Sequence, residues 1–586
     1  MLELKYLNKY LLKYKTKIII GILITIIARI FALVAPNLIG NSITIIENYI
    51  FKSSSLDIQI VKSKLLTNIL FIVSSAIIAG IFTFIMRQML INVSRFIEFD
   101  LKNEIYKKYQ SLNFDFYKNN RTGDLMNRIS EDVSKVRMYI GPAIMYAITT
   151  LSLFIIVVTY MVNVAPKLTM YTLIPLPILS FIIYKISKII NFKSKVVQEF
   201  LSKLTTYTQE SFSGIKIIKT YTIEKYINNE LMNLAAESKE KNMSLVKIQA
   251  WFFPLMILLI GISNVIVVYI GGNQYMKGEI ELGVLAEFII YVNMLTWPVA
   301  TVGWITSIVQ QAEASQKRIN EFLKTKSSII NVSNKKMIID GKINFNKVSL
   351  TFKETGIKAL NDITFSIKRG ESIALMGNVG SGKSTLLELI CRVYDPNYGE
   401  ILLDENNIKK MNINELRDCI GYVPQSTFLF SDSIINNIKF GKLDASMEEV
   451  EESAETACLT KDIKSFKDKY ETLLGERGVN LSGGQKQRLA IARAIIKKPK
   501  ILILDDSLSA VDTETEEKIL SGLSNVTKNM TVIIATHRVS SAKNCDKILI
   551  LENGSIIEFG SHEDLINNNG YYFTSYQKQS SEKEII

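Results

Sequence analysis

The stretch SIALMGNVGSGKSTLLELI, residues 372–390, decides how the second half of the chain folds. It has the pattern of an apolar strand, a glycine-rich loop and a helix, and Gly377 to Ser384 matches G-x-x-x-x-G-K-[ST] in that context. The glycines let backbone N–H groups turn toward phosphate oxygens, and the helix N-terminus favours the same anion. Lys383 is placed to reach the β- and γ-phosphates, and Ser384 to hold Mg²⁺. The stretch therefore predicts a phosphate-binding loop in an α/β domain.

A second apolar run, ILILDD (501–506), fits a buried strand that ends in two carboxylates. Asp505 at the strand tip suits a Mg²⁺ ligand, directly or through water. Asp506 is placed to orient or polarise an attacking water. The alternative is an acidic turn that only ends the strand. Beside a phosphate loop, the pair favours nucleotide hydrolysis.

The segment LSGGQKQRLAIARAII (481–496) is a glycine-rich turn that leads into a helix, with Ser482 at its cap. It is a second helix terminus suited to an anion in the same domain. One nucleotide does not need two such termini. A face-to-face dimer explains both, because each nucleotide then lies between the phosphate loop of one chain and the LSGGQ of the other.

The composition divides the 586-residue chain into two unlike halves. Residues 1–335 hold 37 Lys and Arg against 21 Asp and Glu, whereas the rest has a small acidic excess. The basic half also contains the long apolar runs, so the expected partner is a lipid bilayer and not nucleic acid. Four cysteines in 586 residues are too few for a disulfide scaffold, and their positions in the second half without CxxC spacing favour reduced thiols.

Six stretches of the first half have the roughly 20 apolar residues that a membrane span needs. They run over 18–40, 67–90, 138–162, 168–190, 251–271 and 283–309. The long stretches 92–136 and 191–250 are rich in Lys and Arg and helical in periodicity, so we expect them to continue the helices into the cytoplasm. The N-terminus and the second half are expected on the same side. We expect a transmembrane domain over 1–323, a linker over 324–340 and a nucleotide-binding domain over 341–586.

Two charged side chains, Arg29 and Glu287, lie inside the expected spans. Buried charges are costly in hydrocarbon, so both are expected to face other helices or a wet cavity. A polar substrate pathway and a structural contact between helices both account for them, and both interpretations stay open.

These motifs, in this order and over almost the whole chain, resemble the half-transporters of the ATP-binding cassette (ABC) exporters. The resemblance implies an α-helical transmembrane domain of the type IV exporter fold, with six spans, followed by an α/β P-loop NTPase domain. It implies ATP and Mg²⁺ as cofactors and a second half-transporter as partner. It also implies a small hydrophobic or amphipathic substrate and a place in the bacterial inner membrane, with the N-terminus and the nucleotide-binding domain cytoplasmic.

The roles of the family's residues carry over onto the matching positions. The ATP-binding residues implied are Phe352, Gly377, Asn378, Val379, Gly380, Ser381, Gly382, Lys383, Ser384 and Thr385. Mg²⁺ ligands are implied at Ser384, Gln425 and Asp505, and catalytic roles at Asp506, Gln425 and the switch histidine His537. The signature residues that contact the partner's nucleotide are Leu481, Ser482, Gly483, Gly484 and Gln485.

Further segments resemble parts of the family that connect its domains. The D-loop is identified at Ser509 and Asp512, and GERG at 475–478 is similar to the exporter X-loop. Residues 114–132 and 210–221 resemble the two coupling-helix regions, of which the second is expected to reach the opposite chain.

The chain departs from the family pattern at two positions. Phe352 stands where the adenine-stacking residue is usually Tyr, and its ring can still stack. Asp505 resembles the Walker B aspartate of the family, which is usually followed by Glu. In this chain the residue that follows is Asp506. The shorter side chain draws the carboxylate back, and a misplacement near 1 Å can cost about 10²-fold in rate.

Three interpretations follow from Asp506. The first is an exporter subunit that pairs with a different half-transporter carrying Glu at that position. The second is a homodimeric exporter or lipid flippase in which Asp506 suffices. The third is an ATP-binding regulatory subunit with a hydrolysis-impaired site. The spans do not identify the substrate.

Overall fold

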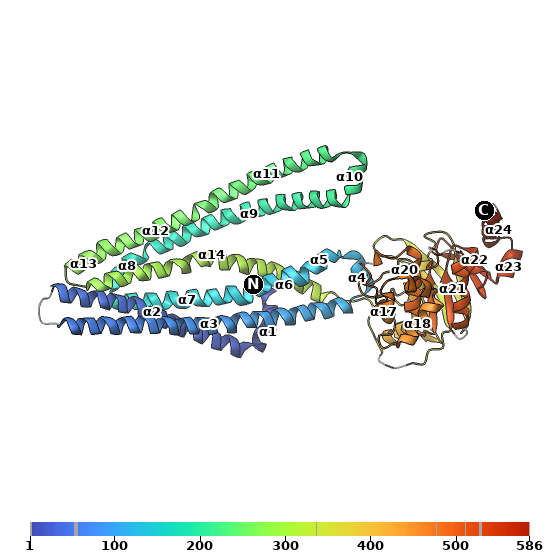
Figure 1. Cartoon of the computed structure of the whole chain (residues 1–586), viewed down its shortest axis with the longest axis horizontal. Coiled ribbons are helices and arrows are strands. Elements are labelled where there is room, and N and C mark those ends of the chain that lie inside the picture. Colours follow the sequence, from blue (N-terminus) through green and yellow to red (C-terminus); the bar gives the residue numbers. More distant parts are fainter. Residues whose placement is uncertain are drawn as a thin grey trace. The chain divides into compact units, whose positions relative to one another are not determined.

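The computed structural model describes residues 3–51, 57–333, 335, 337–475, 478–509, 511, 513–526 and 530–584. They form two compact units. Unit 1 comprises Met1–Ser111 and Asn120–Thr325, and unit 2 comprises Leu112–Asn119 and Lys326–Ile586. Each unit has its own core, and Figure 1 labels many of their helices.

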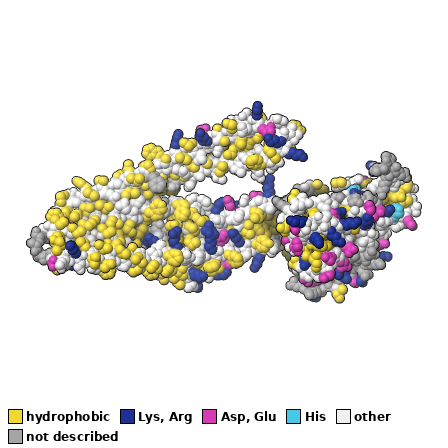
Figure 2. Space-filling model, viewed as in Figure 1, with side chains coloured by type: hydrophobic (Ala, Val, Ile, Leu, Met, Phe, Trp, Pro, Cys, Tyr) yellow, Lys and Arg dark blue, Asp and Glu magenta, His cyan; other side chains and the backbone are white. Residues whose placement is uncertain are grey.

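Unit 1 is entirely helical over its described residues. Its helices are η1 (Glu3–Leu7), α1 (Asn8–Lys13), α2 (Lys15–Phe51), α3 (Ile58–Ser111), α5 (Thr122–Asn127), η2 (Arg128–Asp132), α6 (Val133–Met138), η3 (Tyr139–Ala143), α7 (Ile144–Val164), α8 (Pro166–Leu173), α9 (Pro175–Ser213), α10 (Ile215–Tyr221), α11 (Glu224–Ala250), α12 (Phe252–Ile266), η4 (Val267–Gly271), α13 (Gly272–Met276) and α14 (Leu282–Lys324). Hydrophobic side chains cover much of the surface of the long helices (Figure 2).

Within the described residues, five helical stretches are long and apolar enough to cross a membrane: Lys15–Phe51, Ile58–Ser111, Thr122–Val164, Glu224–Met276 and Leu282–Lys324. They contain the first, second, third, fifth and sixth expected spans. The strong apolar character of these segments allows them to be found from sequence alone.

The expected fourth span differs from the other five because the structure divides it between two helices. Residues 168–190 were predicted as one helix, but α8 ends at Leu173 and α9 begins at Pro175. Pro175 has no N–H to donate to the preceding turn, which interrupts the helical hydrogen bonds at Ile174 alone, where the backbone itself stays helical (φ −52°, ψ −45°). α9 then runs on through Lys185 and Lys188, and this stretch is not among the five.

Close helix packing in unit 1 depends on small residues. α2 and α14 approach at Gly40 and Gly283, where a Cβ on Gly283 would overlap the carbonyl oxygen of Gly40. A Cβ on Gly40 would in turn overlap Glu287, which is 4 % exposed and accepts a 3.3 Å hydrogen bond from Asn37. Glu287 therefore faces other helices, as expected for an intramembrane carboxylate.

Unit 2 contains two sheets and the helices packed on them. Its strands are β1 (Ile343–Thr351), β2 (Lys358–Ile367), β3 (Ser372–Met376), β4 (Tyr398–Leu403), β5 (Asn406–Asn407), β6 (Ile420–Val423), β7 (Ile501–Asp505), β8 (Thr531–Ala535), β9 (Lys547–Glu552) and β10 (Ser555–Gly560). Its helices are α4 (Phe114–Asn119), α15 (Lys383–Ile390), η5 (Ile408–Lys410), α16 (Ile413–Asp418), α17 (Ile434–Lys439), α18 (Met447–Thr456), α19 (Thr460–Ser465), η6 (Lys469–Glu471), α20 (Gly483–Ile495), α21 (Thr513–Val526), α22 (Val539–Ala542), α23 (His562–Asn567) and α24 (Tyr571–Glu584).

The larger sheet sets the geometry of this unit. Its order is β10-β9-β3-β8-β7-β6, and β8 pairs in parallel with both β3 and β7. Alternate residues of β7 enter opposite core clusters, with Leu502 and Leu504 on one face and Ile501 and Ile503 on the other. The carboxyl ends of β3, β8 and β7 therefore lie side by side at one edge, where parallel sheets place their ligands.

We expect Gly283→Ala to destabilise unit 1, because the added Cβ overlaps the α2 backbone. Overpacking of this kind costs about 1–3 kcal/mol. A thermal melt of the detergent-solubilised protein should show a midpoint several degrees lower. Gly80→Ala is the matched control, since a Cβ there meets nothing within 4 Å. Equal melting points for the two variants would contradict this packing.

Candidate functional site

The loop between β3 and α15 has the backbone shape that a phosphate loop needs. Gly377 and Gly382 both have positive φ, at 141° and 103°. A Cβ on Gly377 would overlap the carbonyl oxygen of Leu551, so only glycine fits there. Lys383 folds back over the loop and donates to the carbonyl oxygens of Gly377 (2.8 Å) and Asn378 (2.9 Å). Burial lowers the pKa of the Lys383 ammonium, and the carboxylates of the site oppose that shift.

The carboxyl end of β7 brings Asp505 against this loop. Ser384 Oγ donates to Asp505 Oδ1 at 3.1 Å, and Tyr422 on β6 donates to Asp505 Oδ2 at 3.4 Å. Asp505 is only 4 % exposed, and burial raises its pKa against the two hydrogen bonds that lower it. Ser384 and Asp505 are both predicted Mg²⁺ ligands and are 121 residues apart in the sequence. The fold brings them into direct contact.

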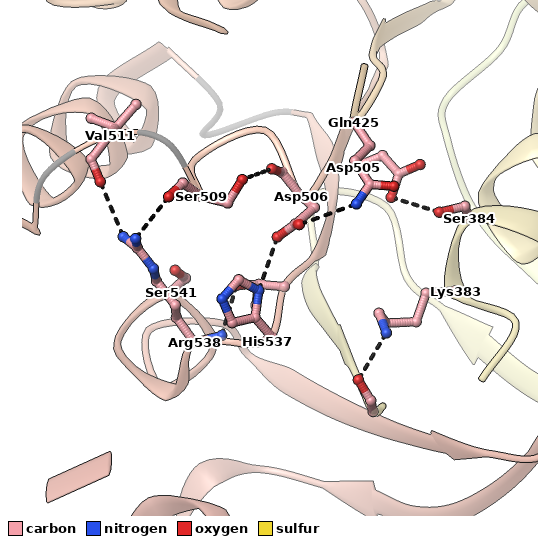
Figure 3. Close-up of polar contacts among 12 residues, drawn as sticks. Lys383, Ser384, Gln425, Asp505, Asp506, Ser509, Val511, His537, Arg538 and Ser541 are labelled. Atoms are coloured by element: carbon pink, nitrogen blue, oxygen red, sulfur yellow. Dashed lines mark hydrogen bonds and ion pairs between the residues drawn. The ribbon is translucent and has the colours of Figure 1, made fainter. Parts of the chain in front are cut away.

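Asp506 follows at the end of β7 and is contacted from two sides (Figure 3). Its Oδ1 lies 3.1 Å from Nδ1 of His537, and its Oδ2 accepts from Gln425 Nε2 at 3.4 Å. Its backbone is left-handed, with φ of 46°, a conformation that Asp tolerates better than most residues. The three residues with predicted catalytic roles therefore meet at one point.

A cavity of about 960 Å³ opens over these groups. Phe352 lines it beside the phosphate loop, and so do Lys383, Asp505, Asp506 and His537. Its size is at the upper end of the range for sites that bind small molecules. Phe352 packs edge-on against Tyr394, with ring centroids 5.5 Å apart.

α4 belongs to unit 2 and also lines this cavity, through Lys118. The Lys118 ammonium lies 4.7 Å from the centre of the Phe352 ring, within cation–π range. Asn119 donates a hydrogen bond to Glu354, and Asn113 donates to Ser328 Oγ at 2.8 Å. The first expected coupling region thus supplies a side chain at the predicted base-stacking residue.

The signature segment begins α20. Ser482 is the N-cap: its Oγ accepts from Gln485 N at 3.3 Å, and Gln485 Oε1 accepts from Ser482 N at 2.9 Å. This reciprocal pair confirms the cap predicted from sequence. Ser482 and Gly483 are exposed, and neither is among the residues that line the cavity.

An arginine connects the D-loop to the loop that carries His537 (Figure 3). Arg538 donates to the carbonyl oxygens of Ser509 (2.9 Å) and Val511 (3.1 Å). Its guanidinium also pairs at 2.6 Å with Glu516, which is 1 % exposed. Asp512, predicted in the D-loop, lies outside the described residues, as do positions 476 and 477 of the predicted X-loop.

Comparison with known proteins places both halves in one family. Residues 18–299 match the model of the ABC transporter transmembrane region, and residues 360–509 match that of the ABC transporter. The multidrug resistance-like ATP-binding protein MdlA of Buchnera aphidicola subsp. Baizongia pistaciae is 38% identical over 92% of each chain. The chain belongs to the ABC transporter family.

Other relatives of this ABC transporter cover it to the same extent. The probable multidrug resistance ABC transporter ATP-binding/permease protein YheI of Bacillus subtilis is 33% identical, over 94% of this chain and 93% of the relative. A solved structure of a bacterial Atm1-family ABC exporter with ATP bound superposes with a TM-score of 0.80. It covers 96% of this chain and 98% of its own at 23% identity, which shows a shared fold.

Sequence reasoning missed several residues that line the cavity or touch its carboxylates. They are Lys118, Tyr422, Tyr571, Ser575, Lys578 and Gln579. Tyr422 lies three residues before Gln425 on a strand beside β7, and that adjacency was a usable signal. The α24 residues gave none, because they follow the last recognised motif.

We expect Lys383→Ala to lower the affinity for ATP by about 10- to 100-fold, since a charge-assisted hydrogen bond contributes roughly 1.5–3 kcal/mol. Equilibrium binding of a fluorescent ATP analogue to the purified chain measures this. Lys368→Ala is the control, because that lysine is exposed and outside the cavity. Equal affinity in the two variants would contradict the assignment of Lys383 to phosphate binding.

Proposed function

We propose that this ABC transporter uses ATP to export a small hydrophobic or amphipathic molecule across the bacterial plasma membrane, as one half of a dimer. The observation that carries the proposal is the joining of five membrane-length helices to the Lys383, Ser384 and Asp505 site in a single chain. The multidrug-resistance names of the relatives support the substrate class. The Lys-rich N-terminus supports a cytoplasmic position for that end and for the nucleotide-binding domain.

Dimerisation is supported by the exposed signature. Ser482 and Gly483 lie outside their own chain's cavity, so we propose that they complete the cavity of a second half-transporter. α10, in the second coupling region, supports the same arrangement. It exposes large apolar side chains, with Ile217 62 % and Tyr221 74 % accessible, as expected of a surface that docks on another chain.

The residues of the site fit Mg²⁺. Ser384 and Asp505 offer only oxygen atoms, the ligands that Mg²⁺ prefers, and nucleotide phosphates and water complete such a site. Bound there, Mg²⁺ would neutralise charge on the β- and γ-phosphates.

The residues of the site then divide the work of hydrolysis among them. Lys383 leaves the loop carbonyls and binds the β- and γ-phosphates, while the N–H groups of the loop hold the remaining oxygens. Asp506 accepts a hydrogen bond from the attacking water and aligns it with the γ-phosphate. His537 and Gln425 hold the Asp506 carboxylate from opposite sides, and His537 is exposed enough to reach the γ-phosphate as well.

We propose that the partner is a different half-transporter that carries Glu at the Asp506 position. Two hydrogen-bond partners restrain the short Asp506 carboxylate, which limits its reach toward a water molecule. The intact signature of this chain would then serve the partner's site. A homodimer in which Asp506 suffices is the alternative, and the Asp506–His537 contact favours it because a fully degenerate site has no need of the histidine.

Export is tested in inside-out vesicles that contain this chain alone or together with a candidate partner. ATP should drive accumulation of a hydrophobic fluorescent dye, whereas Lys383→Ala and a non-hydrolysable ATP analogue should not. A chain that hydrolyses ATP without moving any of a panel of cationic, neutral and anionic amphiphiles would contradict the multidrug proposal.

We expect Asp506→Glu to increase ATP turnover by the chain alone, up to about 10²-fold, because the extra methylene restores the missing reach. Steady-state phosphate release in lipid nanodiscs measures it, with Asp506→Asn as the control that keeps the size and removes the charge. Unchanged turnover in Asp506→Glu would mean that the reach of this carboxylate does not limit the rate.

A further inference from the structure

Helix α24 touches both ends of the nucleotide cavity, although none of the family motifs includes it. At its first residue, Tyr571 Oη donates a 2.9 Å hydrogen bond to Oδ1 of Asn378 in the phosphate loop. Two turns later, Gln579 contacts the loop that carries His537. Ser575 and Lys578, between them, also line the cavity.

The first turn of α24 is fixed to the core of unit 2. The Glu558 carboxylate accepts hydrogen bonds from the backbone N–H groups of Tyr571 and Tyr572, which satisfies donors that a helix N-terminus leaves free. Tyr572 is fully buried, and its hydroxyl lies 2.7 Å from Nδ1 of His562. α24 is therefore a rigid support from which its later residues project.

The Gln579 amide makes two hydrogen bonds to one short stretch of backbone. Its Nε2 donates to the carbonyl oxygen of His537 at 2.9 Å, and its Oε1 accepts from Val539 N at 2.8 Å. Val539 is the first residue of α22, whose N-cap Arg538 makes no side-chain cap. Gln579 thus caps α22 from 40 residues away and clamps the backbone on both sides of Arg538.

Among the described residues, the polar contact of the His537 side chain is with Asp506. Its side chain is 60 % accessible and its ring contacts the Asp506 carboxylate at 3.1 Å. An exposed side chain takes the position that its backbone allows. The two hydrogen bonds from Gln579 therefore act together with the side-chain contacts of Arg538 to set where the imidazole lies relative to Asp506.

We propose that Gln579 is a positioning residue for ATP hydrolysis, which acts through the backbone of residues 537–539 to hold His537 against Asp506. The proposal rests on the role proposed above for His537 and is independent of what the transporter exports. It predicts that Gln579→Ala lowers the rate of the chemical step more than it weakens ATP binding, because Gln579 bonds to the backbone beside His537 and the contacts of Lys383 do not depend on it.

The kinetic test uses the full-length assembly in lipid nanodiscs. Gln579→Ala should lower kcat about tenfold, a part of the 10²-fold that a 1 Å misplacement costs, with a smaller change in KM for ATP. Gln577→Ala is the matched control, since Gln577 is exposed on the same helix. The double variant with His537→Ala should be no slower than His537→Ala alone, because Gln579 acts only through that histidine.

A second measurement reports on the contact in the chain itself, whatever its turnover. Amide hydrogen exchange over residues 536–542 should become about fivefold faster in Gln579→Ala and stay unchanged in Gln577→Ala, with equal melting points for all three proteins. Unchanged exchange overturns the proposal, as does a loss that appears in KM and not in kcat, or an additive loss in the double variant. If His537→Ala keeps full activity, the role of His537 fails and the proposal falls with it. If His537→Ala is slow and Gln579→Ala is not, only the role of Gln579 fails.

Discussion

The parallel pairing of β3, β8 and β7 is the constraint on which the nucleotide site depends. Because neighbouring strands run the same way, three loops from distant parts of the sequence begin at one edge of the sheet. One brings the phosphate loop, one brings Asp505 and Asp506, and one brings His537. The register of the strands aligns all three loops at once, so the site residues do not each need a separate long-range contact to come together. The two core clusters that enclose the sheet keep that register fixed.

In the nucleotide site, burial disfavours the charged side chains and hydrogen bonds stabilise them. Burial raises the pKa of Asp505 and lowers that of Lys383, so both charged forms are disfavoured by their surroundings. Ser384 and Tyr422 compensate Asp505, and loop carbonyl oxygens compensate Lys383. These partners hold the places that phosphate oxygens and a cation would take. The proposed binding of ATP with Mg²⁺ would therefore exchange one set of polar contacts for another and leave no buried charge without a partner.

The sequence predicted what local pattern can specify. Glycine spacing, strand-ending carboxylates and the Ser482 cap were found because each depends on neighbours within a few positions. The break before Pro175 was missed, because hydropathy averaged over a span does not register a single residue without an N–H. Gln579 and Lys118 could not be predicted either. Their partners lie about 40 and 230 residues away, and only the folded chain shows that α24 and α4 reach the cavity.

The placement of Lys118 has a thermodynamic consequence. α4 lies in the sequence between the long helices α3 and α7 of unit 1, yet it belongs to unit 2 and its lysine sits on the ring proposed to stack adenine. A nucleotide that displaces the Lys118 ammonium from the Phe352 ring changes the free energy with which α4 is held at the cavity. Linkage is reciprocal, so any change in the membrane helices that shifts α4 alters nucleotide affinity by the same factor. A substrate that shifts α4 when it binds to unit 1 would therefore change the ATP dissociation constant even before any phosphate is released.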